Sequence, residues 1–507
     1  MRRVFLCAAC TALLQACTST GGRSDLSATT QYTPARLRTD CATAAVVGLR
    51  WDAPRARVAH YEITRDGTSL GTTTETYIAD TTVAESTHYS YSVTAVPASS
   101  APARGASTTE IHTPAASPTG DAPYCRSKHI ESMSWDWAGG HTEPDGSDLW
   151  PVTWGRDNRV YTFFGDGGGF GGDNYRGRAS FGIATIAHSP PLRPDSVRNV
   201  YGGYNSSHPS TLQGKGGAII AVGSDFYTLG GLYTDAETAG HTGPVSGSPK
   251  RRQLAYSKGN AHSWHAASWT FCSAEDGELH GNFCPLGFVN HGRGNAGAPD
   301  GQVYLLGFVN STAQWNDGEQ QTAASTYLAR VAKKRVLEAD AYRYFAGLDA
   351  RGRPIWTADQ QLMQPIFTDR NASRPGCGGR CNMTSMLGEA VYDRGIRRYI
   401  ATAQGDYVGQ TSFYDAPHPW GPWTTISYNN IDAETGAGGW ANLGTTGGES
   451  LGVHMVNAWT SPDGLGLWAT YSSDGKAPAG ALFPPAGTPM DSFNLVSVRL
   501  SPGPALR

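Results

Sequence analysis

Short strand-like segments that end in glycine-containing turns recur along most of this chain. Examples are residues 159–164, 302–306, 398–402 and 467–471, and turns such as Pro299-Asp300-Gly301 stand before them. A chain that repeats one small group of strands favours a radial array of small sheets, which is a β-propeller. Five blades between residues 125 and 507 would average about 76 residues each, so long loops are expected. A double-sheet jelly roll is the competing fold.

Composition supports an all-β protein with more than one domain. The 507 residues exceed what one ordinary core accommodates. The 63 glycines and 30 prolines suit short strands joined by tight turns. Only residues 328–345 resemble a helix. The formal net charge of −3 comes without a basic stripe, which disfavours nucleic acid as a partner.

The region before the propeller predicts a small β-sandwich. Residues 46–51, 61–65 and 89–96 contain strand-like runs, and the last two alternate with a period of two. This region, residues 33–114, resembles a fibronectin type III domain, which implies that Trp51 is the core tryptophan and Tyr89 the corner tyrosine. A linker rich in Ala, Pro, Ser and Thr is expected at 115–124, followed by the five-bladed β-propeller at 125–507.

The N-terminus predicts export. Met1-Arg2-Arg3 is basic, and the apolar run at residues 4–14 is too short to span a bilayer. Leu14-Gln15-Ala16-Cys17 resembles a bacterial lipobox, so residues 1–17 are expected to be a lipoprotein signal peptide with Cys17 as the lipidated residue. Residues 18–32 would then be a flexible tether, and the membrane a partner through the lipid. The expected location is the cell envelope, at the outer membrane, or the extracellular space; an ordinary secretory signal is the alternative.

Six cysteines remain after the signal peptide, an even number that predicts disulfides in an oxidising compartment. Their spacing favours Cys272–Cys284 and Cys377–Cys381, and elimination then leaves Cys41–Cys125. A zinc site at Cys377 and Cys381 is the rival interpretation, but no other ligand stands at zinc spacing. We therefore expect no metal. We also expect that the protein needs no cofactor and is a monomer.

Two aspartates are the main candidates for chemistry. Asp148 precedes Trp150 and Trp154, and Asp166 opens the run Asp166-Gly167-Gly168-Gly169. A hairpin that turns at residues 155–158 would place Asp148 beside Asp166. Glycoside hydrolysis needs two such carboxyl groups, one protonated and one ionised, and neighbouring carboxylates separate in pKa. The two tryptophans could stack on sugar rings. The alternative is an ordinary hairpin, since Asp and Gly are common in turns.

These segments resemble the opening blade of a bacterial five-bladed propeller family, formerly of unknown function, that includes endo-D-arabinanases. The similarity covers about residues 130–500 and implies a glycoside hydrolase whose catalytic pair is Asp148 and Asp166. Residues 257–264 depart from the turn that such propellers often carry. The other matching segments are residues 288–293, 342–349, 414–423 and 459–464, and the expected substrate-binding residues are Asp145, Trp150, Trp154, Asn290 and Trp459.

We therefore expect an enzyme that cleaves furanosidic polysaccharide, with D-arabinan as the substrate. A non-catalytic glycan-binding lipoprotein is the alternative, and a Ser/His hydrolase finds no Gly-x-Ser-x-Gly motif. Weaker candidates for the central axis are Glu389, Glu449, Asp300 and His454. Lone acids in loops are more often solvated turn residues, and a lone histidine is more often structural.

Overall fold

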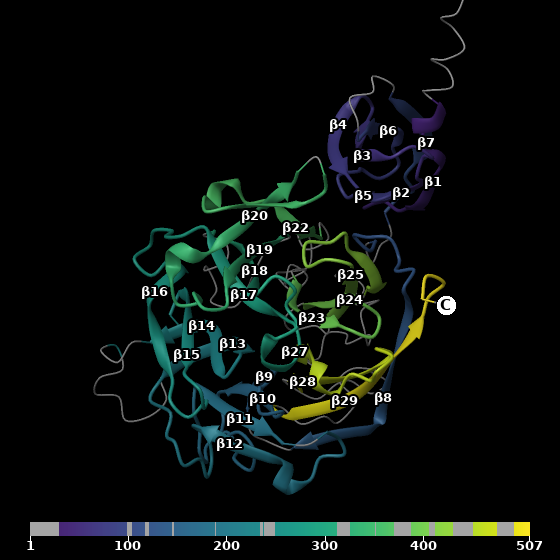
Figure 1. Ribbon diagram of the computed structural model, residues 1–507. Helices are drawn as coiled ribbons and strands as arrows, with labels where there is room; N and C mark the ends of the chain where they lie inside the picture. Colours follow the sequence, from purple (N-terminus) through teal and green to yellow (C-terminus); the bar gives the residue numbers. More distant parts are fainter. Residues whose placement is uncertain are drawn as a thin grey trace, which may run out of the picture.

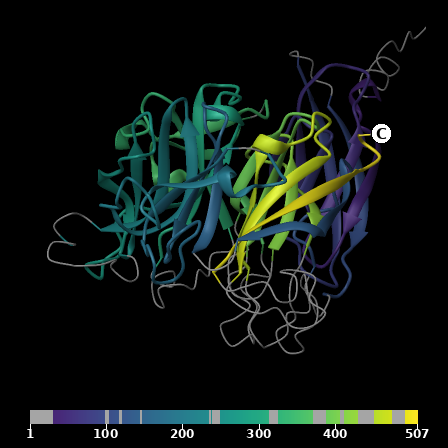
Figure 2. The same ribbon diagram turned by 90° about the horizontal axis from the view of Figure 1, so that it is seen from below.

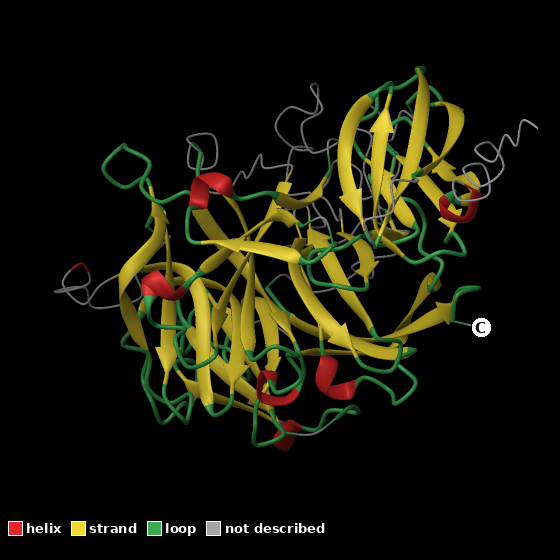
Figure 3. Cartoon of the chain, turned by 45° about the horizontal axis from the view of Figure 1, so that its top comes forward, coloured by secondary structure: helices red, strands yellow, loops and turns green. Residues whose placement is uncertain are grey.

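The described part of the computed structural model is built almost entirely of β-strands, with a few 3-10 turns of three residues between them (Figure 3). The all-β prediction is confirmed. Within the described residues, no helix has the length and apolar character needed to cross a membrane. The structure describes residues 30–98, 104–116, 121–143, 147–187, 189–233, 237, 249–311, 325–349, 351–369, 387–404, 411–428, 450–473 and 491–506.

The N-terminal body is a sandwich of two sheets, with strand orders β1-β2-β5 and β4-β3-β6-β7 (Figure 1). Trp51 is buried in its core, edge-on to Tyr61 at 5.1 Å between ring centroids. The hydroxyl of Tyr89 accepts a hydrogen bond from the amide of Ala84 at 2.7 Å. Both residues thus occupy the positions expected of a fibronectin type III domain. The strands are β1 (Ala35–Ala42), β2 (Val47–Asp52), β3 (Val58–Arg65), β4 (Thr68–Thr73), β5 (Tyr77–Asp80), β6 (His88–Pro97) and β7 (Gly105–His112).

The second body is a five-bladed propeller, as predicted (Figure 1). Blade 1 contains β9 (Asp148–Trp154), β10 (Val160–Gly165), β11 (Gly182–Ile186) and β12 (Val197–Tyr201). Blade 2 contains β13 (Gln213–Val222), β14 (Asp225–Tyr233), β15 (Arg251–Ser257) and β16 (His265–Ser273). Blade 3 contains β17 (Phe283–Asn290), β18 (Gln302–Val309), β19 (Ser325–Ala332), β20 (Arg343–Leu348), β21 (Pro354–Thr357) and β22 (Pro365–Thr368). Blade 4 contains β23 (Leu387–Asp393), β24 (Arg398–Gln404), β25 (Thr411–Ala416) and β26 (Thr424–Ser427), and blade 5 contains β27 (Ser450–Met455), β28 (Gly466–Ser473), β29 (Phe493–Pro502) and β8 (Ile130–Glu143).

The first strand of each blade lies next to the central axis. The strands β9, β13, β17, β23 and β27 contact one another in that order, and β27 contacts β9 again. Strands β17 and β23 even pair directly, in parallel, at Val289 and Ala390. The ring is closed because β8, which precedes blade 1 in the chain, pairs with the last strand, β29. Figure 2 shows the ring from its side, with the yellow C-terminal strands beside the blue start of the propeller.

Apolar side chains fill each interface between neighbouring blades. Each blade therefore buries both of its faces, and each large aliphatic or aromatic side chain buried in this way contributes about 1.5–3 kcal/mol. Representative pairs are Phe163 and Ala221 between blades 1 and 2, Ile220 and Phe288 between blades 2 and 3, Leu306 and Ala401 between blades 3 and 4, Ile400 and Val453 between blades 4 and 5, and Trp150 and Phe493 between blades 5 and 1.

The prediction of a helix at residues 328–345 is wrong. The segment contains most of β19, a short 3-10 turn and the start of β20. Leu328, Ala329 and Val331 are all buried, because β19 lies between two packed blade interfaces. A strand that is apolar on both faces loses the period of two, so its pattern could be mistaken for that of a helix.

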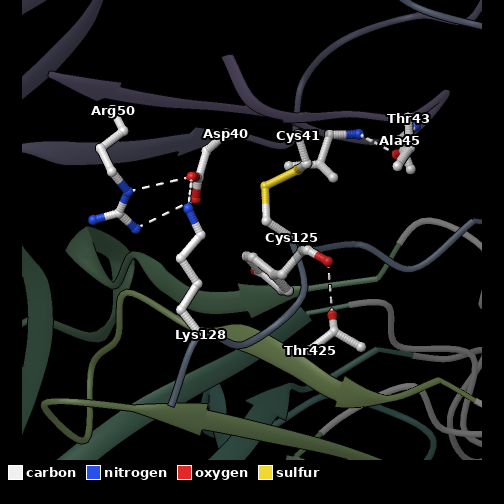
Figure 4. Close-up of a disulfide and its surroundings, with 10 residues drawn as sticks. Asp40, Cys41, Thr43, Ala45, Arg50, Cys125, Lys128 and Thr425 are labelled. Carbon is white, nitrogen blue, oxygen red and sulfur yellow. Dashed lines mark hydrogen bonds and ion pairs between the residues drawn. A yellow bond between two sulfur atoms is a disulfide. The ribbon is translucent and has the colours of Figure 1, made fainter. Parts of the chain in front are cut away.

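A disulfide joins the sandwich to the propeller. Cys41 on β1 is bonded to Cys125, which lies shortly before β8 in the chain (Figure 4). Beside it, Asp40 forms ion pairs with Lys128 of the propeller and with Arg50 of the sandwich. The chain after Cys125 is itself bound to blade 4, since Thr425 donates its amide hydrogen to the carbonyl of Cys125 at 2.8 Å.

Two of the three predicted disulfides are confirmed. Besides Cys41–Cys125, the structure contains Cys272–Cys284, which links β16 of blade 2 to β17 of blade 3. Cys377 and Cys381 lie outside the described residues, as does the predicted lipidation site Cys17.

Candidate functional site

Asp148 and Asp166 lie at the same end of the β9–β10 hairpin in blade 1. Asp148 is the first residue of β9, and its cross-strand partner in the β9–β10 hairpin is Gly165. Asp166 follows Gly165 directly and has a left-handed backbone with φ of 55°. A Cβ placed on Gly165 would lie 3.4 Å from Oδ1 of Asp148. The Asp148 carboxylate therefore lies close to the backbone that carries Asp166.

Two cations flank the Asp166 carboxylate. Nζ of Lys215 lies 2.6 Å from Oδ2, and a guanidinium nitrogen of Arg178 lies 3.7 Å from Oδ1. Arg178 also donates hydrogen bonds to the carbonyls of Asp166 and Asn174, which fixes the loop that follows β10. Coulomb attraction from both cations stabilises a negative charge on Asp166. The sequence did not reveal Lys215, because it comes from the neighbouring blade.

The position of Lys215 follows from the packing of β13 against β9. The amide of Ala221 donates to Oγ1 of Thr153 at 2.9 Å, which aligns the two strands. Lys215 lies six residues before Ala221 on β13, and Asp148 lies five residues before Thr153 on β9. At about 3.3 Å per residue, both therefore lie at the same end of the axis.

A carboxylate–imidazole pair connects the inner strands of blades 4 and 5. Nδ1 of His454 on β27 lies 2.6 Å from Oε2 of Glu389 on β23. Both side chains are largely buried, with 9% and 12% of their surface exposed. Each residue was only a weak candidate in the sequence, because nothing in the chain showed that they meet.

Trp150 cannot stack on a sugar as predicted, because its side chain is buried. It is 1% exposed and packs among Phe164, Phe170 and Phe493. Its indole nitrogen donates to the carbonyl of Ser147 at 2.8 Å. A strand irregularity explains the difference: φ is positive at Leu149 and at Trp150, and such a bulge redirects the side chains of a strand. Here it coincides with Trp150 pointing into the interface with blade 5.

Three other predicted substrate-binding residues lie at the opposite end of the propeller. Trp154 is the last residue of β9, Asn290 is the last of β17, and Trp459 lies in the turn Asn457–Trp459 after β27. Inner strands of a propeller run in the same direction, and the seven residues of β9 span about 20 Å. The structure therefore does not bring these three residues together with Asp148 at the start of β9.

Asn290 belongs to a buried hydrogen-bond network at that opposite end. Its Nδ2 donates to Oγ1 of Thr153 at 3.4 Å, and its Oδ1 accepts from Asn457 at 3.2 Å. Thr153 also accepts from the amide of Ala221. The network thus connects blades 1, 2, 3 and 5, which is a structural role.

The remaining candidates divide into two groups. Asp300 is a turn residue between β17 and β18, where it accepts a hydrogen bond from the hydroxyl of Tyr304 at 2.5 Å. Asp145 and Glu449 lie outside the described residues. Among the residues that are described, no group of three or more His, Cys, Asp or Glu side chains is arranged to hold a metal ion.

Comparisons with known proteins give only distant likenesses. No protein-family model and no curated protein matches this sequence. Among solved structures, RS223-β-xylosidase has a TM-score of 0.35 and 10% identity over 71% of this chain and 94% of that chain. A GH43_1 enzyme from Xanthomonas citri has a TM-score of 0.32 and 12% identity, over 74% and 88%. The fn3 domain of the human collagen α-1(XX) chain matches 20% of this chain and 97% of its own, with 21% identity and a TM-score of 0.17. At TM-scores this low, none of these likenesses bears on function.

Proposed function

We propose that this protein is a glycoside hydrolase that cleaves furanosidic polysaccharide, with D-arabinan as its substrate. The observation that supports this most is the β9–β10 hairpin, which brings Asp148 and Asp166 to one end of the axis. Paired carboxyl groups on a rigid hairpin are what glycoside hydrolysis requires. The choice of D-arabinan rests on the resemblance of the first blade to the arabinanase-containing family.

The surroundings of the two aspartates suggest different roles. Asp166 lies between Lys215 and Arg178, so it suits the ionised carboxylate that attacks the anomeric carbon. Asp148, at the start of β9, would then be the acid that protonates the leaving oxygen. We propose a retaining course, which requires the two carboxyl groups to lie about 5–5.5 Å apart. Water would then release the glycosyl group from Asp166, with Asp148 acting as the base.

The proposal extends to the location of the protein. Two disulfides in the described residues indicate an oxidising compartment, as expected of an exported protein. We propose that lipid on Cys17 anchors it to the cell envelope. Labelling with a radioactive fatty acid, with Cys17→Ala as the control, tests this step.

Turnover of purified D-arabinan tests the activity. Wild-type protein should generate new reducing ends, and Asp148→Asn and Asp166→Asn should each reduce the rate about 100- to 10,000-fold. Both variants should still bind the polymer and keep the wild-type melting temperature. Full turnover by either variant would remove that aspartate from the mechanism. Binding by the wild type without new reducing ends would instead identify a non-catalytic glycan-binding protein.

A further inference from the structure

The carboxylate–imidazole pair of Glu389 and His454 lies beside the axis. Both residues are on innermost strands, β23 and β27. Val453 and Met455, on either side of His454, pack into the cluster between blades 4 and 5. Alternation along a strand then directs His454 to the opposite face, toward blade 1. Because His454 faces blade 1 and yet bonds Glu389 of blade 4, its imidazole lies near the axis between them.

The pair is also close in height to Asp148. Thr470 on β28 is the cross-strand partner of His454. Its Oγ1 donates to the carbonyl of Trp150 at 2.9 Å. Trp150 is two residues from Asp148, a distance of about 7 Å along a strand. His454 and Asp148 are therefore on adjacent inner strands, at neighbouring levels.

The carboxylate determines how the imidazole can bond. If Glu389 is ionised, its carboxylate only accepts hydrogen bonds, and Nδ1 of His454 then donates the hydrogen bond to it. This leaves Nε2, on the other side of the ring, as an acceptor in the neutral imidazole. Among the residues that the structure describes, none is bonded to Nε2. A sugar hydroxyl can donate to such a nitrogen.

We infer that His454, held in one tautomer by Glu389, contacts substrate by accepting a hydrogen bond at Nε2 from a furanose hydroxyl. Glu389 is then a positioning residue that acts through His454. The inference rests on the proposed function, since it assigns both residues to the site of Asp148 and Asp166. The competing interpretation is that the pair only links blades 4 and 5.

Nitrogen-15 NMR of labelled histidines tests the contact directly. The probe is a D-arabinan hexasaccharide, added to the Asp166→Asn variant so that no turnover occurs. The Nε2 resonance of His454, assigned by its loss in His454→Gln, should shift when the sugar binds. An unchanged resonance at saturating sugar would overturn the inference. If this resonance shifts but the wild-type protein shows no hydrolytic activity, the contact is supported and the proposed hydrolase is refuted.

Kinetics separate substrate contact from blade linkage. His454→Gln should raise KM at least fivefold with little change in the melting temperature, and Glu389→Gln should give part of this loss. The double variant should be no worse than His454→Gln, because Glu389 acts through the imidazole. Additive losses, or unchanged KM in all three variants, would contradict the inference. The matched control is His141→Gln, which breaks a similar His–Glu pair with 2.9 Å separation on the outer strand β8 and should leave KM unchanged.

Discussion

Lys215 is the residue whose removal best separates chemistry from stability. Its ion pair with Asp166 is partly exposed, and such pairs contribute only about 0–1 kcal/mol to folding. Loss of the ammonium group would nevertheless remove one of the two cations that hold the Asp166 carboxylate, and small displacements of a reacting group cost about 100-fold in rate. Substitution of Lys215 should therefore affect the reaction rate much more than the folding stability.

We predict that Lys215→Met lowers kcat/KM on D-arabinan about 10- to 100-fold while the melting temperature stays near that of the wild type. Lys258→Met is the matched control, since it removes a similar ion pair, with Asp225 at 2.8 Å, from the same blade. Equal activity of the two variants would show that Lys215 does not support Asp166 in the reaction.

Asp393 gives the protein a pH-dependent stability. It ends β23, is 1% exposed, and accepts hydrogen bonds from the amides of Gly395 and Ile396. Burial raises the pKa of its carboxyl group to about 6, from an ordinary value of 3.8, and nearby Asp463 adds to the effect. Between these two values the folded state binds more protons than the unfolded state, so stability falls as the pH rises.

Asp393→Asn should remove this dependence. The free energy of unfolding of the variant, relative to wild type, should rise by about 1–3 kcal/mol between pH 4 and pH 7. Urea unfolding at both pH values measures it. For Asp463→Asn, the free energy of unfolding relative to wild type should instead fall as the pH rises, because hydrogen bonds from Ser461 and Leu465 lower the pKa of Asp463. A parallel response of the two variants would contradict this account.

At the scale of single elements, the sequence predicted hairpins better than side-chain directions. The turn at residues 155–158 and the pairing of Asp148 with the segment before Asp166 follow from local pattern, and both are present. The burial of Trp150 does not follow from pattern, because it depends on a bulge that only appears once β9 packs against blade 5. Trp154 and Asn290 were predicted to lie in the site of Asp148 and Asp166 from sequence proximity and motif similarity. Neither signal shows at which end of a strand a residue lies.

The two tryptophans of β9 should therefore respond differently to substitution. Trp150→Ala should destabilise the protein by about 3–5 kcal/mol, because it leaves a cavity between blades 1 and 5. Trp154→Ala should cost far less, since Trp154 is partly exposed beside a turn, and it should leave activity on arabinan unchanged. Chemical denaturation and a reducing-end assay measure both effects. Loss of arabinan binding in Trp154→Ala would restore it as a substrate-binding residue.

At the scale of the whole molecule, the propeller could be predicted from recurring strand-like segments and the sandwich from alternating strands, whereas the number of blades came from the family resemblance. The contacts between blades could not, since Lys215 with Asp166 and Glu389 with His454 join residues that only the closed ring brings together. The docking of the sandwich was foreseen only in the pairing of Cys41 with Cys125. The ion pairs of Asp40 that accompany it depend on the placed surfaces.

We predict that the disulfide makes the two domains unfold together. Cys41→Ser with Cys125→Ser should split a single calorimetric transition into two and increase the radius of gyration measured by X-ray scattering. The double variant Cys272→Ser with Cys284→Ser should lower stability by about 2–4 kcal/mol without releasing the sandwich. If the first variant keeps one transition and an unchanged radius, the ion pairs of Asp40 suffice to hold the domains together.

Because β8 pairs with β29, the propeller ring can close only after the last strand has been delivered. A chain that is exported N-terminus first delivers the sandwich, Cys125 and β8 long before β29, the final strand, arrives. Until then β8 has an open edge, and the ring that brings Asp148, Lys215 and Glu389 to one axis is incomplete. Every earlier intermediate is thus inactive, and a protein shortened by its last dozen residues would lose catalysis altogether rather than in proportion.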